Sequence, residues 1–118
     1  MPNLIMEYTN SVDERSNVQL LLEELHQGMM DSELFEISSI KSRAIRLNQW
    51  LIGEHQDRED FIHVTVELLK GRTDEEKGRL AEKLIQILAK NAVHIESLTV
   101  NIRDMEPLYF RKFAHNVL

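Results

Sequence analysis

Residues 61–76 read FIHVTVELLKGRTDEE, and no other stretch says more about how the chain folds. The side chains of residues 61–69 are mostly apolar or β-branched and alternate with a period of two, which is typical of a strand with one buried face. Gly71 and Arg72 are predicted to form a turn, and Thr73 with Glu76 has the spacing of a capping box. The stretch therefore predicts a strand that runs through a short turn into a helix.

Downstream of this turn, the chain is predicted to complete a strand-helix-strand unit. One face of the helix is apolar at helical spacing, and its members are Leu80, Leu84, Ile87 and Leu88. A further strand is marked by the alternating residues Leu98, Val100 and Ile102. Pro107 is predicted to end regular structure ahead of a short, partly apolar tail.

The first half of the chain has the same order of elements. Residues 1–8 alternate like a strand, residues 9–15 are polar like a loop, and Ser16 with Gln19 has the spacing of a capping box. The helix predicted behind it has one apolar face, made of Val18, Leu21, Leu22, Leu25 and Met29. A second strand is predicted over residues 40–50, followed by a polar connection over residues 53–60.

Two strand-helix-strand units predict an α+β fold with two layers, in which one four-stranded mixed sheet carries both helices on one face. The strands within each unit should be parallel, because crossovers of this kind are right-handed and return in the same direction. The other face of the sheet then needs cover. Phe61, His63 and Thr65 point toward that face, and a partner subunit is the simplest way to cover it.

Bulk composition restricts the classes of function. The chain has 118 residues, which predicts a single domain over residues 1–118, and it has no cysteine, which excludes disulfides and thiol chemistry. A net charge of −6 argues against a nucleic-acid partner, and no stretch is apolar enough to indicate a membrane span or a signal peptide. A cytoplasmic protein is expected. A small carboxylate remains a possible substrate if a few cations converge locally.

The first residues carry the chemistry of greatest interest. Proline is small enough at position 2 for Met1 to be removed, which would expose the secondary amine of Pro2. In a partly apolar pocket beside cations, the charged form of an amine is disfavoured and its pKa falls. Pro2 would then serve as a general base near neutral pH and, once protonated, as a general acid. With Met1 retained, the Pro2 nitrogen is a tertiary amide with no basicity.

Three cations could converge on the start of the first strand. Lys41 and Arg43 share one face of the second strand, and Arg72 lies in the turn after the third. Arginine can grip a carboxylate in a bidentate fashion, whereas lysine acts as a point charge. These three residues are the candidate substrate-binding groups. No metal site is predicted, because the histidines lack metal-ligand spacing; they are His26, His55, His63, His94 and His115.

Several segments together resemble the 5-carboxymethyl-2-hydroxymuconate isomerases of the tautomerase superfamily. Residues 2–10 resemble the start of those proteins, residues 40–44 their Ile-Arg-Ser-Arg segment, and Trp50 falls where they carry a tryptophan. Residues 61–65 and 71–73 resemble their Phe-Val-His-Met-Thr strand and Gly-Arg-Ser turn. The similarity covers nearly the whole chain.

The resemblance implies a homotrimer with no metal or organic cofactor, acting in aromatic-compound catabolism. It implies that Pro2 moves a proton within an unsaturated 2-hydroxy or 2-oxo dicarboxylate such as 5-carboxymethyl-2-hydroxymuconate. Matched position by position, it places catalytic roles at Pro2 and Arg72 and carboxylate binding at Lys41, Arg43 and Arg72.

Two departures leave alternatives open. Lys41 stands where the family has an arginine, and the turn before Arg72 has one glycine fewer than the family's. Another reaction of the superfamily is therefore an alternative, namely that of a decarboxylase, a hydratase or a phenylpyruvate-type tautomerase. A non-catalytic trimeric binding protein on the same fold is the second alternative.

Overall fold

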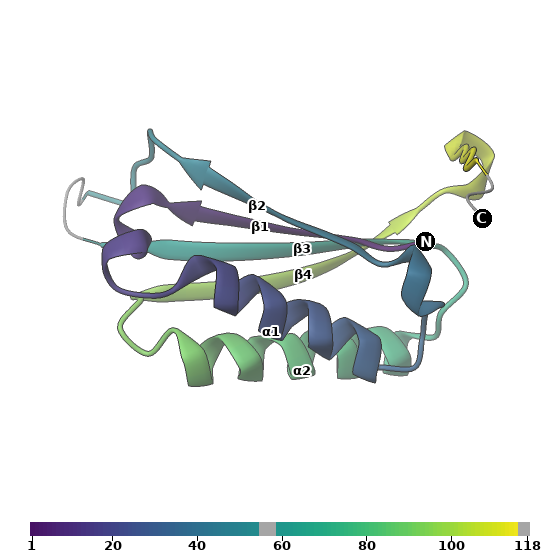
Figure 1. The fold of residues 1–118 in the computed structure, drawn as a ribbon, viewed down its shortest axis with the longest axis horizontal. Coiled ribbons are helices and arrows are strands. Elements are labelled where there is room, and N and C mark those ends of the chain that lie inside the picture. Colours follow the sequence, from purple (N-terminus) through teal and green to yellow (C-terminus); the bar gives the residue numbers. More distant parts are fainter. Residues whose placement is uncertain (55–58, 116–118) are drawn as a thin grey trace.

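A computed structural model describes residues 1–54 and 59–115. Four strands and two α-helices build the fold (Figure 1), and in chain order they are β1 (Asn3–Thr9), α1 (Val18–Asp31), β2 (Lys41–Leu47), β3 (Phe61–Leu69), α2 (Asp74–Asn91) and β4 (Ser97–Met105). Short 3-10 helices lie between them, namely η1 (Asn10–Glu14), η2 (Ile37–Ser39) and η3 (Pro107–Tyr109). Within the described residues, no helix is both long and apolar enough to span a membrane.

The strands form one mixed sheet in the order β2-β1-β3-β4. β1 pairs in parallel with β2, and β3 in parallel with β4, as the two strand-helix-strand units predict. The units join through β1 and β3, which are antiparallel. Both helices cover the same face of the sheet (Figure 1). The predicted two-layer α+β architecture is confirmed.

Alternation along the strands separates a core face from an open face. Ile62, Val64, Val66 and Leu68 are fully buried under the helices, whereas Phe61, His63 and Thr65 on the open face are half-buried. On that face, Nδ1 of His63 lies 2.6 Å from Oγ1 of Thr99. The predicted facing of this strand is therefore confirmed, and its histidine pairs with a polar neighbour outside the core.

The N-cap of α2 is the predicted residue, whereas the N-cap of α1 is not. Thr73 and Glu76 form the predicted capping box at the start of α2. At α1, however, the N-cap is Asn17 and not Ser16, because the Asn17 side chain accepts a hydrogen bond from the Leu20 amide at 3.0 Å. The amide of Ser16 instead donates to the Val12 carbonyl, which closes the preceding turn.

Other element boundaries are also shifted. β2 ends at Leu47 and not at residue 50, because Leu47 pairs with Thr9, the last residue of its neighbour β1. Trp50 therefore lies beyond the end of β2 that is distant from Pro2. The loop expected over residues 9–15 contains η1, and Pro107 begins η3 instead of ending regular structure.

A buried carboxylate stabilises the end of the sheet opposite the N-terminus. Asp60 is 2% exposed and accepts hydrogen bonds from the Thr9 hydroxyl at 2.5 Å, from the Ser11 hydroxyl, and from Nη1 of Arg15 at 2.9 Å. Burial alone would raise the pKa of Asp60, but the hydrogen bonds from Ser11, Thr9 and Arg15 outweigh burial and lower it. The charged carboxylate is therefore the form that stabilises the fold.

We expect Asp60→Asn to lower the free energy of unfolding at pH 7 by about 2–3 kcal/mol, because hydrogen bonds to a buried charge are lost. A group with a lowered folded pKa stabilises the fold above its unfolded pKa, and this contribution disappears as the pH falls through the folded value. Urea unfolding at neutral and acidic pH should show the gap between wild type and variant closing in acid. The exposed Glu14→Gln is the control, and a gap independent of pH would contradict this role.

Candidate active site

Pro2 is buried and fixed at one end of the sheet. Its carbonyl accepts a hydrogen bond from the Lys41 amide at 3.2 Å, which extends the parallel β1–β2 ladder by one step. The N-terminus lies at the end of the molecule that also carries η2 and the turn from β3 to α2 (Figure 1). The backbone of Pro2 is therefore held by the sheet and does not hang on a free tail.

Arg72 reaches across this end of the molecule from the β3–α2 turn. Its Nη1 donates to the Leu69 carbonyl at 3.1 Å, and its Nη2 donates to the Leu34 carbonyl at 3.0 Å. The Cζ atom lies 5.0 Å from the centroid of the Phe35 ring, within range of a cation–π contact. A guanidinium has five N–H donors, so these two bonds leave donors for a ligand.

Lys41 lies beside the first residues, and Arg43 is farther along the same strand. Nζ of Lys41 is 3.6 Å from Sδ of Met1, and the lysine is exposed. Arg43 pairs with Ile5 and is exposed on the same face, about 6–7 Å along β2 from Lys41. Arg43 therefore lies farther from Pro2 along the open face than Lys41 does.

The electrostatics of the N-terminus reflect this arrangement. The pKa of the Met1 amine is lowered, first by burial and then by the positive charges of Arg72, Lys112 and Lys41. The negative charge of Glu36 acts in the opposite direction. Of the four predicted site residues, the structure thus brings Pro2, Lys41 and Arg72 together around the N-terminus.

Sequence patterns did not indicate three further neighbours, which are Phe35, Glu36 and Lys112. Phe35 and Glu36 follow α1 in an irregular segment, and Lys112 lies in the tail beyond β4. Tertiary folding brings these segments to the N-terminus, and no local periodicity reports it.

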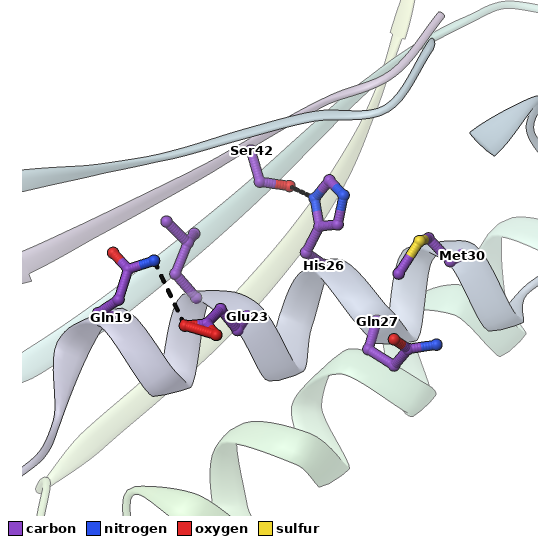
Figure 2. Close-up of a pocket in the computed structure, with 7 residues that line it drawn as sticks. Gln19, Glu23, His26, Gln27, Met30 and Ser42 are labelled. Carbon is purple, nitrogen blue, oxygen red and sulfur yellow. Dashed lines mark hydrogen bonds between the residues drawn. The ribbon is translucent and has the colours of Figure 1, made fainter. Parts of the chain in front are cut away.

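A separate cleft of about 400 Å³ lies between the outer face of α1 and β2. Figure 2 shows His26 of α1 pointing toward Ser42 of β2, with the two side chains joined by a hydrogen bond of 2.7 Å. Ser42 lies between Lys41 and Arg43 in a strand, so its side chain points to the opposite face of the sheet. The cleft is therefore distinct from the cationic site around Pro2.

No metal site accompanies either feature within residues 1–54 and 59–115. In those ranges, no three His, Cys, Asp or Glu side chains gather closely enough to hold a metal ion. His55 lies outside the described residues. Around the N-terminus, an amine lies beside cations, an arrangement that suits proton transfer on an anionic molecule.

A family model described as 5-carboxymethyl-2-hydroxymuconate isomerase matches residues 2–106. The chain belongs to the 5-carboxymethyl-2-hydroxymuconate isomerase family. The match begins at Pro2 and includes Lys41, Arg43 and Arg72. A curated relative, the 5-carboxymethyl-2-hydroxymuconate Delta-isomerase of Escherichia coli, is 22% identical over 112 residues, covering 91% of this chain and 89% of the relative.

Solved structures show the fold of this isomerase family in other proteins. A 5-carboxymethyl-2-hydroxymuconate isomerase from Deinococcus radiodurans R1 superposes with a TM-score of 0.86 at 21% identity, covering 97% of this chain and 90% of that one. A wild-type fused 4-OT described as a symmetric trimer has a TM-score of 0.70 at 19% identity, with 88% and 85% covered. Both similarities confirm the tautomerase-like fold that the sequence predicts.

Proposed function

We propose that this protein, once Met1 is removed, is an isomerase that uses the Pro2 amine as general base and general acid. Its proposed substrate is an unsaturated 2-hydroxy or 2-oxo dicarboxylate such as 5-carboxymethyl-2-hydroxymuconate. One observation carries the proposal: the charges of Arg72 and Lys41 act on the N-terminal amine, next to the buried Pro2, in a chain that belongs to this isomerase family.

The proposed mechanism follows from charge and burial. After loss of Met1, the free amine would be on Pro2, which is buried, and burial disfavours the protonated form. The positive charges of Arg72 and Lys41 act in the same direction. A neutral amine takes a proton from the enol oxygen or carbon of the substrate and returns it to a distant carbon. The cations bind the carboxylates and stabilise the negative charge that develops between the two steps.

The assembly proposed for this enzyme is a homotrimer of single domains spanning residues 1–118. The open face of the sheet supports it, because Phe61, His63 and Thr65 are only half-buried there. The similarity in fold to a symmetric trimer supports it as well. The proposed setting is the cytoplasm and the catabolism of aromatic compounds. Light scattering after gel filtration measures the mass of the assembly, and a monomer at micromolar concentration would contradict this part.

The experiment that tests the function joins mass spectrometry to an activity assay. Intact mass establishes whether the purified chain begins at Pro2. The processed chain should isomerise 5-carboxymethyl-2-hydroxymuconate, and a variant that keeps an N-terminal extension ahead of Pro2 should not. Turnover by the extended chain, or none by the processed chain, would overturn the proposal.

Two observations favour testing, in the same experiment, the alternatives of another superfamily reaction and of a non-catalytic binding protein. Lys41 stands where the resemblance implies an arginine, and two nitrogen atoms of Arg72 donate to backbone carbonyls. Both observations fit a substrate whose carboxylates are placed differently, and both also fit a protein that binds a dicarboxylate without turning it over. A substrate panel for decarboxylation, hydration and phenylpyruvate-type tautomerisation separates the catalytic alternatives. Saturable binding of a dicarboxylate with no reaction would identify the non-catalytic one.

A further inference from the structure

The guanidinium of Arg72 is held by two segments that are distant in sequence. One hydrogen bond goes to the carbonyl of Leu69, the last residue of β3, and the other goes to the Leu34 carbonyl in the segment after α1. The Phe35 ring lies next to the guanidinium, with Cζ of Arg72 5.0 Å from the ring centroid. Two hydrogen bonds alone leave a planar group free to tilt, and contact with a ring restricts that tilt.

The segment that carries Phe35 is itself fixed. The Ser32 hydroxyl donates to the Met29 carbonyl at 2.7 Å and accepts from the Leu34 amide at 3.3 Å. Glu33 between them has a φ of 61°, in the left-handed region, which turns the chain back toward the sheet. Leu34 and Phe35 then pack against the hydrophobic core. Phe35 is therefore packed against the core on one side and lies against the guanidinium of Arg72 on the other.

An aromatic ring provides two things that an aliphatic side chain of similar size does not. Its negative face attracts the guanidinium, an effect that corresponds to about 3- to 30-fold in an equilibrium constant. It also shields one side of the cation from water, and a charge acts more strongly on its neighbours where less water intervenes. Both effects hold the charge of Arg72 beside the Phe35 ring, from where it lowers the pKa of the N-terminal amine.

We propose that Phe35 is a positioning residue that orients Arg72 toward the Pro2 amine and the substrate carboxylate. The inference rests on the proposed function of Pro2 and Arg72 and deepens it. Phe35 makes no contact with the reacting atoms in this scheme, and it acts only through the arginine. The loop after α1 is thereby part of the active site, although it contributes no charged group that touches the substrate.

The test compares Phe35→Leu, which keeps apolar bulk, with Phe35→Tyr, which keeps the ring. In the leucine variant we expect KM for the dicarboxylate to rise about 3- to 30-fold, since this is the range of the lost contact. The acidic limb of the kcat/KM profile should also move to higher pH, because the amine regains its proton more readily when Arg72 moves away. The tyrosine variant should resemble wild type in both readouts.

Controls separate this inference from the proposed function itself. Ile37→Ala removes an exposed apolar side chain in the same segment and should leave KM and the pH profile unchanged. Titration of the N-terminal amine by NMR in wild type and Phe35→Leu needs no turnover. An unchanged amine pKa together with an unchanged KM would overturn the role of Phe35. Full activity of Pro2→Ala would overturn the proposed function, whatever the Phe35 variants show.

Discussion

Pro2→Ala is expected to lower kcat/KM by about 10²- to 10⁴-fold, the usual contribution of a general base. The variant still has an N-terminal amine after Met1 is removed, but it is a primary amine that rotates about its N–Cα bond. In the wild type the pyrrolidine ring prevents this rotation, and the Lys41 amide holds the Pro2 carbonyl at 3.2 Å. The direction of the nitrogen lone pair is therefore set in the wild type and lost in the variant.

Steady-state kinetics on a chain with a verified N-terminus measure this effect. Asn3→Ala is the matched control, because it changes the next residue and leaves the amine in place. Gel filtration and thermal unfolding should show that Pro2→Ala keeps the fold and the assembly of the wild type. Turnover within threefold of wild type, in a variant with Met1 removed, would contradict the role of Pro2.

The second large effect is expected at Arg72. We expect Arg72→Ala to lower kcat/KM by about 10²- to 10³-fold, which is typical when one stabiliser of a developing negative charge is removed. Lys41→Ala should lower it by clearly less, because Lys41 is exposed and binds as a point charge. Kinetics on both single variants and on the double variant show whether the two cations act on the same carboxylate.

Arg72 also connects the end of β3 to the segment after α1 through hydrogen bonds. A loss of activity in Arg72→Ala therefore has to be distinguished from a loss of folded structure. Arg72→Lys keeps the positive charge but cannot make both carbonyl bonds and the ring contact in the same way. Intermediate activity in this variant would favour the electrostatic role. Lys41→Arg restores the arginine that the family carries and should lower KM for a dicarboxylate. Equal and negligible effects of Arg72→Ala and Lys41→Ala would show that the pocket lies elsewhere.

Much of the fold follows from local patterns. The alternation over residues 61–69 assigned each side chain to its correct face, and the Thr73–Glu76 spacing located the start of α2. Two of the predictions that failed did so because neighbouring segments decide them. β2 ends where β1 no longer pairs with it, and Asn17 and not Ser16 caps α1 because Ser16 bonds to the preceding turn.

The candidate site was predictable only in part. Pro2 and Arg72 are candidates from residue type and from the family resemblance, and the structure places Arg72 and Lys41 near the N-terminus. Phe35 and Lys112 were not identified, because their proximity depends on the path of the chain after α1 and after β4. A residue that acts by packing against a cation leaves no periodic signal in the sequence.

The state of the Pro2 nitrogen is the central claim, and NMR titration of that nitrogen in the processed chain tests it directly. The pKa of an ordinary α-amino group is about 7.7–8.0. Burial and the charges of Arg72 and Lys41 lower the pKa of the Met1 amine, and we expect them to lower that of the Pro2 amine in the processed chain, which increases the neutral fraction of the amine at neutral pH. In Arg72→Ala the value should rise toward the ordinary range. A pKa at or above the ordinary range in the wild type, unchanged in Arg72→Ala, would contradict the account.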